Sequence, residues 1–233
     1  MREKRKGHRI LVLGETYSGK SHWVINDWFA DIMDCKYELI YWYTGSEDDL
    51  PDVQKLAKHV KKNGKIKFVL NPSIEQIERH MEAIREVQKM LEQMDKPLLK
   101  VSFVFDDLMN ERSLFNPHRP SLIEKIFSKG RHDHIDVIVI GQGYSGFFNK
   151  STRNINPSAL VLYCLPPDAV SDIVSENCLV NVDKGELLTK MSQAITPHSG
   201  NKYPFMVIDK TSKTPEGRFH FNGKSFRPTF NNC

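Results

Sequence analysis

One eight-residue stretch constrains this chain more than any other: GETYSGKS, from Gly14 to Ser21. It fits the pattern G-x-x-x-x-G-K-[ST], follows the apolar run Arg9–Leu13 and precedes a helix-like segment. In this pattern, glycines let backbone N–H groups converge on phosphate oxygens at the start of a helix. Lys20 is predicted to reach the β- and γ-phosphates, and Ser21 to ligate Mg²⁺. The predicted nucleotide contacts are Gly14, Glu15, Thr16, Tyr17, Ser18, Gly19, Lys20, Ser21 and His22.

A nucleotide held by a P-loop needs a second acidic site to finish holding its metal. The apolar run Phe103–Phe105 supplies one, because it ends in Asp106 and Asp107. Asp106, at the strand tip, is predicted to hold Mg²⁺ through its water shell, together with Ser21. Asp107 is predicted to act as a base or to position water. A helix cap or a pair of loop aspartates is the alternative, which the nearby P-loop disfavours.

Apolar runs alternate with helix-like segments along most of the chain. Strands are expected at 9–13, 38–44, 66–70, 101–105, 135–140 and 159–164, and helices at 20–33, 52–62, 73–94, 121–129 and 168–176. The clearest helix begins at Ser73, which can cap it with Gln76 in the capping-box position. This alternation predicts an α/β fold with a mostly parallel sheet and helices on both faces.

A chain of 233 residues is expected to form one domain. Residues 1–183 are predicted to be the core, with a short basic N-terminal arm. From Lys184 the pattern weakens to a helix that reaches Met191 and short β segments at 204–208 and 218–223. Residues 184–233 are therefore predicted to be an extension that packs on, or extends, the same domain.

Other classes of P-loop protein leave their own signals. GTPases read guanine with an N/T-K-x-D motif, and residues 149–152, NKST, lack the aspartate. A small-molecule or nucleoside kinase needs a lid with clustered arginines. Arg112 and Arg119 could only form a sparse cluster of this kind. The sequence therefore disfavours a GTPase and leaves two alternatives open, a kinase and a non-enzymatic nucleotide-binding switch or scaffold.

The order of motifs resembles one superfamily. A P-loop, an apolar strand ending in Asp-Asp, the residues KGRH, and an Ile/Val strand ending in Gln142 are similar to the FtsK–HerA superfamily of DNA-pumping ATPases. The pair Arg131-His132 and the later stretch 152–154, TRN, are most similar to poxvirus-type DNA-packaging ATPases. The similarity spans about Arg9 to Leu165. It implies a P-loop NTPase fold of the ASCE/RecA-like kind.

The resemblance also implies a place for Gln142. In that family the Gln-tipped strand lies between the P-loop strand and the Asp-Asp strand, which would put Gln142 beside the γ-phosphate. An amide can donate to a phosphate oxygen and accept from the attacking water, so it can sense hydrolysis. The alternative is that Gln142 merely ends a strand before the turn 143–146.

Phosphoryl transfer also needs a cation, which ring ATPases often supply from a neighbouring subunit. Arg131 matches the family's candidate for this residue, and Arg153 is the second candidate. The alternative for Arg131 is an ion pair with Asp133 or Asp136 of its own subunit. The chain departs from many relatives, which carry Asp-Glu where it has Asp106 and Asp107.

The resemblance implies an ATP-hydrolysing translocase of double-stranded DNA, most like the genome-packaging motor subunit of a DNA virus. Such a subunit is expected to bind ATP and Mg²⁺, to form a ring, hexameric or pentameric, and to meet a capsid or portal vertex. A cellular or plasmid HerA/FtsK-like pump is the main alternative, because it shares the same motifs.

Basic residues gather at 1–9, at 61–67 and after Lys184, where they can follow the DNA backbone or simply form a solvated surface. No helix-turn-helix or zinc motif suggests that base sequence is read. The four cysteines form no CxxC pair, no secretory signal opens the chain, and no apolar run approaches a membrane span of about 20 residues. These features predict an intracellular protein, in the host cytoplasm or a virus factory, with virion association as a further expectation.

Overall fold

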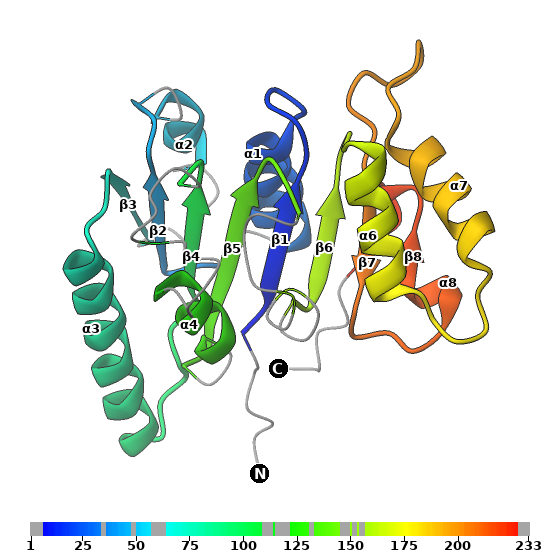
Figure 1. Cartoon of the computed structure of the whole chain (residues 1–233). Helices are drawn as coiled ribbons and strands as arrows, with labels where there is room; N and C mark the ends of the chain where they lie inside the picture. Colours follow the sequence, from blue (N-terminus) through cyan, green and yellow to red (C-terminus); the bar gives the residue numbers. More distant parts are fainter. Residues whose placement is uncertain are drawn as a thin grey trace.

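The computed structural model describes residues 7–33, 36–47, 50–56, 64–108, 114, 122–130, 133–144, 150, 153 and 157–227. Within them one eight-stranded sheet has the order β3-β2-β4-β5-β1-β6-β7-β8 (Figure 1). The strands are β1 (Arg9–Leu13), β2 (Leu39–Thr44), β3 (Lys65–Leu70), β4 (Val101–Asp106), β5 (Ile135–Gly141), β6 (Ala159–Leu162), β7 (Met206–Asp209) and β8 (Phe219–His220). Every pairing from β3 to β6 is parallel, and β7 and β8 pair antiparallel.

Helices cover both faces of the sheet. They are α1 (Lys20–His22), the π-helix η1 (Trp23–Ile32), α2 (Leu50–Leu56), α3 (Ile74–Gln93), α4 (Leu122–Lys129), α6 (Pro167–Asn177), α7 (Lys184–Ile195), α8 (Pro215–Arg218) and the 3-10 helix η4 (Gly223–Ser225). On β1, Leu11 and Leu13 pack with α3, α4, α6 and α7, whereas Ile10 and Val12 pack with η1 and α2. Figure 1 shows the same division, with α3, α4 and α6 in front of the sheet and α1 behind it.

The strands of the centre are apolar because both of their faces are covered. All residues of β4 and β5 are buried, including the polar Ser102 and Asp136. Such near-continuous runs of β-branched and aromatic residues are typical of parallel sheets. The predicted cap of α3 is present, since the Gln76 backbone N–H donates to Ser73 Oγ over 3.2 Å.

Residues 184–227 join the same sheet. β7 pairs antiparallel with β6, and its four residues are buried. Asp183 caps α7, because its Oδ1 accepts from the Glu186 backbone N–H over 2.7 Å. No helix among the described residues is both long and apolar enough to cross a membrane.

Candidate nucleotide-binding site

Backbone hydrogen bonds hold the loop 14–19 against the carboxyl ends of β5 and β6, the two strands that flank β1. The Gly14 N–H donates to Gly141 O over 3.1 Å, and the Glu15 N–H donates to Cys164 O over 3.0 Å. A Cβ added at Gly14 would lie 2.5 Å from Tyr163 Cβ, so no larger residue fits there. Gly19 has φ of 95°, in the left-handed region that favours glycine. Each of the two positions therefore requires glycine for a different steric reason: lack of space at Gly14 and a positive φ at Gly19.

Lys20 and Ser21 follow this loop at the start of α1. The Lys20 ammonium donates to Glu15 O over 2.6 Å, so the side chain lies back across the loop. Burial lowers the pKa of Lys20, and the charges of Asp106, Asp107 and Glu15 partly offset that effect. Of the motif's side chains, Tyr17 is almost fully exposed, at 92%. His22 faces its own helix, with Nδ1 lying 3.2 Å from Asn26 Nδ2.

Ser21 and Asp106, the two predicted magnesium ligands, meet in the structure. Ser21 Oγ donates to Asp106 Oδ2 over 2.9 Å, although 85 residues separate them in the chain. Asp106 is the last residue of β4 and is 4% exposed. The described residues hold no cluster of three or more His, Cys, Asp or Glu that suits a metal. The contact brings one hydroxyl and one carboxylate together at the start of α1.

Gln142 and Asp107 lie side by side at the neighbouring strand tips. β5 pairs with β4 on one side and with β1 on the other, which confirms the strand order expected from the resemblance. Gln142 Nε2 approaches Asp107 Oδ1 at 3.4 Å, the long end of a hydrogen bond. Asp107 has φ of 48°, a conformation that non-glycine residues rarely adopt and that occurs often at functional sites.

Of the two arginine candidates, only Arg153 is among the residues that the structure describes. Arg131 lies outside the described residues. Of the two aspartates considered as its partners, Asp133 accepts from Arg85 Nη2 over 2.8 Å, and Asp136 accepts from the His8 N–H over 2.7 Å and from the Tyr37 hydroxyl.

Arg153 is held inside its own chain. Its Nη2 donates to Glu176 Oε1 over 2.8 Å and its Nε to Glu176 Oε2 over 3.1 Å. The guanidinium lies 4.9 Å from the centre of the Tyr144 ring, and the Tyr144 hydroxyl donates to Glu176 Oε2 over 2.6 Å. The side chains of the ion pair are 11% and 6% exposed. Sequence reasoning missed Tyr144 and Glu176, because neither belongs to a motif.

Several basic residues of the C-terminal segment also have partners. Lys190 pairs with Glu186 over 2.6 Å, and Arg227 pairs with Asp31 over 3.1 Å. Arg218 donates to three backbone carbonyl oxygens, those of Ser212, Lys210 and Asn177. The positive charge that the sequence gathers after Lys184 is therefore partly used to hold this segment in place.

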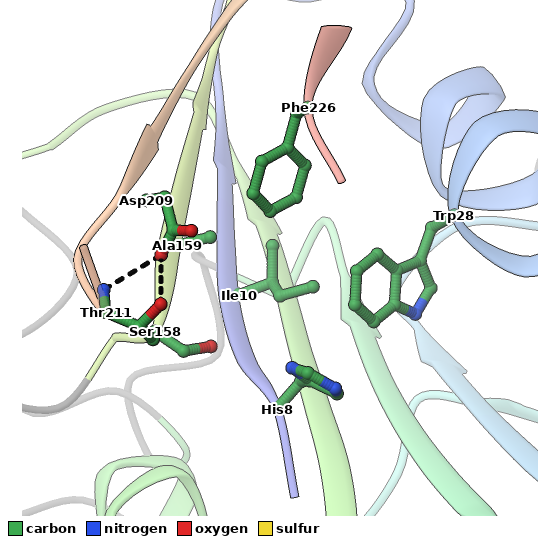
Figure 2. A pocket seen from close by; sticks show the side chains of 8 residues that line it. All are labelled: His8, Ile10, Trp28, Ser158, Ala159, Asp209, Thr211 and Phe226. Carbon is green, nitrogen blue, oxygen red and sulfur yellow. Dashed lines mark hydrogen bonds between the residues drawn. The ribbon is translucent and has the colours of Figure 1, made fainter. Parts of the chain in front are cut away.

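A small cavity lies at the opposite end of β1 from the P-loop (Figure 2). Its lining residues are His8, Ile10, Trp28, Ser158, Ala159, Asp209, Thr211 and Phe226. Asp209 Oδ1 accepts from both the backbone N–H and the hydroxyl of Thr211, over 2.8 and 2.6 Å. The volume of about 20 Å³ admits one water molecule at most. This cavity is a packing gap between η1 and the sheet.

No protein-family model and no curated protein matches the chain. Among solved structures, the chain is similar to the DNA-packaging ATPase B204 from Sulfolobus Turreted Icosahedral Virus, with a TM-score of 0.60 and 14% identity over 90% of this chain and 96% of that one. It is similar to the genome packaging NTPase B204 from Sulfolobus turreted icosahedral virus 2 in complex with ATP-gammaS, with a TM-score of 0.57 and 14% identity over 89% and 94% of the two chains.

A third similar structure is EssC (ATPases 2 and 3) from Geobacillus thermodenitrificans, with a TM-score of 0.53 and 14% identity. The match covers 87% of this chain and 38% of that one. At such identities the likeness establishes the fold. The chain has the fold of a genome-packaging NTPase, which confirms the predicted α/β P-loop fold with its mostly parallel sheet and helices on both faces.

Proposed function

We propose that this chain is an ATP-hydrolysing motor that moves double-stranded DNA, as the genome-packaging subunit of a DNA virus. The observation that carries the proposal is the contact of Ser21 Oγ with Asp106 Oδ2 at 2.9 Å, which joins the P-loop to the acidic strand tip. The match to nearly the whole length of the B204 packaging ATPase favours packaging over a cellular or plasmid pump, since EssC is matched over 38% of its length.

The donor set suits magnesium. Ser21 and Asp106 offer a hydroxyl and a carboxylate, and Mg²⁺ prefers hard oxygen ligands. Mg²⁺ usually keeps several waters and takes one or two protein ligands plus phosphate oxygens, which fits a site with two protein groups. When bound, the ion would supply charge neutralisation between the β- and γ-phosphates.

The chain's own residues then have separate tasks. Lys20 leaves Glu15 O, its partner at 2.6 Å, and donates instead to phosphate oxygens. Asp107 accepts a proton from the attacking water or orients it. Gln142, whose Nε2 lies 3.4 Å from Asp107 Oδ1, carries an amide oxygen, a group that can accept a hydrogen bond from the same water. Gln142 thereby senses whether the γ-phosphate is present and transmits its loss to β5 and to the segment that follows it.

The partners belong to the same proposal. Non-specific contacts with the DNA backbone, a ring of six or five copies and a capsid or portal vertex would together form the motor, at work in the host cell or virus factory and associated with the virion. Arg131 is proposed as the arginine that reaches a neighbour's phosphates, with Arg153 second. Residues 184–233 are proposed to extend the core, residues 1–183, as one domain.

Steady-state phosphate release tests the function. The rate is expected to rise with double-stranded DNA of any sequence and to fall steeply with salt, because contacts with phosphates release counterions. Lys20→Ala removes a side chain that donates to Glu15 O within its own loop, so the variant is expected to keep the fold and lose turnover. A phosphorylated small molecule, with no response to DNA, would make the chain a kinase. Nucleotide binding without turnover would make it a switch or scaffold.

A further inference from the structure

A second pocket, of about 260 Å³, opens directly beside the P-loop. Its lining residues are Glu15, Thr16, Tyr17, Ser18, Tyr163, Cys164, Pro197, Lys202, Tyr203 and Pro204. Three segments far apart in the chain therefore meet here: the P-loop, the residues that follow β6, and the stretch 197–204 between α7 and β7. The last of these belongs to the C-terminal extension.

The pocket adjoins the backbone predicted to bind phosphate. A Cβ added at Gly19 would lie 3.6 Å from both Tyr163 Cε1 and Tyr203 Cβ, so both tyrosines pack against the P-loop glycine. Ser18 Oγ, also at the pocket, is buried and has no hydrogen-bond partner. A ligand whose phosphates lie on the loop would thus have its remaining part beside these rings.

The walls suit a flat aromatic group. Tyr163 is 3% exposed and stacks on Phe205, with ring centres 5.3 Å apart, so this wall is fixed. Tyr203 is 47% exposed, and its backbone N–H donates to Asn201 Oδ1 over 3.1 Å, which anchors the turn that carries it. The Lys202 ammonium lies 5.2 Å from the centre of the Tyr203 ring. Flat apolar faces next to a cationic donor are what a nucleobase with ring-nitrogen acceptors requires.

We propose that this pocket holds the purine base of the nucleotide, with Tyr203 as its stacking partner and Lys202 as a donor to the base edge. The proposal rests on the proposed function, because it takes the triphosphate to lie on the P-loop. It gives the C-terminal extension a direct part in nucleotide binding: the 197–204 turn forms one wall of the site, and this turn reaches the P-loop because β7 pairs with β6.

The experiment compares the affinity of ATP with that of inorganic tripolyphosphate, which has no base, by calorimetry in the presence of Mg²⁺. Tyr203→Ala is expected to weaken ATP binding by about 5- to 100-fold, the range that removal of one stacking ring gives. It should leave tripolyphosphate binding unchanged. Tyr203→Phe keeps the ring and should retain ATP affinity within about twofold. Met90→Ala, an exposed site on α3, serves as the control for surface truncation.

The outcomes separate this proposal from the proposed function. ATP affinity that survives Tyr203→Ala, or an equal loss for both ligands, overturns the base pocket while leaving the P-loop assignment in place. Lys20→Ala should weaken both ligands, since both use the phosphate site. A wild-type chain that binds neither ligand, or a Lys20→Ala variant that binds both normally, overturns the phosphate site and the base pocket with it.

Discussion

The buried ion pair of Arg153 and Glu176 permits a quantitative prediction of stability. Glu176→Gln removes the carboxylate that accepts three hydrogen bonds, two from Arg153 and one from Tyr144. The two charged side chains are 11% and 6% exposed, so the variant removes a carboxylate that neutralises a nearly buried guanidinium. Breaking a buried pair in this way costs about 3–5 kcal/mol. For a domain of this size that corresponds to a fall in Tm of about 6–20 °C.

Thermal and urea unfolding of Glu176→Gln measure this cost. Glu186→Gln is the matched control, because Glu186 pairs with Lys190 at 2.6 Å but both side chains are more than half exposed. Its expected cost is within about 1 kcal/mol. A loss below about 1 kcal/mol for Glu176→Gln as well would refute the reasoning that burial makes the Arg153 pair costly to break.

The same pair predicts a pH dependence. Burial alone would raise the pKa of Glu176, but hydrogen bonds from Arg153 and Tyr144 outweigh it and lower the pKa below the ordinary 4.5. The pair's contribution is therefore fully present above pH 4.5 and is lost as the pH falls through the lower folded-state pKa. The difference in unfolding free energy between wild type and Glu176→Gln should shrink below that pH. Arg153→Ala should lower stability too, so its activity has to be compared at equal folded fraction.

Asp107→Asn is expected to retain ATP and to slow hydrolysis at least tenfold in single-turnover assays. Asp106→Asn is expected to weaken Mg²⁺-dependent nucleotide binding. The reverse pattern would assign water positioning to Asp106 and the metal to Asp107. Burial, with Arg218 nearby, lowers the pKa of Lys210 to about 8, so between pH 8 and 10.5 the unfolded chain holds a proton that the folded chain has released. Stability relative to Lys210→Met should therefore rise with pH over this interval, and a flat difference would contradict the lowered pKa. Mixed rings of Arg131→Ala and Lys20→Ala should regain activity if the arginine acts in trans, and no recovery in demonstrated mixed assemblies would direct the search to Arg153.

Much of the centre of the fold follows from sequence, because the motifs that define it are local. The GETYSGKS motif and the Phe103–Asp107 run each combine an apolar strand with polar residues at its tip. Parallel strands bring such tips to one edge of a sheet, so the meeting of Ser21 with Asp106 was predictable. The position of β5 between β4 and β1 was expected from the family resemblance.

The parts that sequence did not predict depend on contacts between distant residues. Tyr144 and Glu176 are 32 residues apart, and no periodicity links a tyrosine after β5 to a carboxylate near the end of α6. The pocket proposed for the base depends on the antiparallel pairing of β7 with β6, which brings Tyr203 to Gly19. The π-helical geometry of η1 was likewise unforeseen, because an apolar segment such as 23–32 has the pattern of an ordinary helix.

A triplex-displacement assay tests whether the protein moves along DNA in one direction. A labelled third strand is bound at one end of a long duplex, and its release is followed after the protein and ATP are added. We expect release that requires hydrolysis, is delayed in proportion to the duplex length ahead of the third strand, and is absent for Lys20→Ala and for a non-hydrolysable ATP analogue. DNA-stimulated hydrolysis without release at any duplex length would contradict a motor.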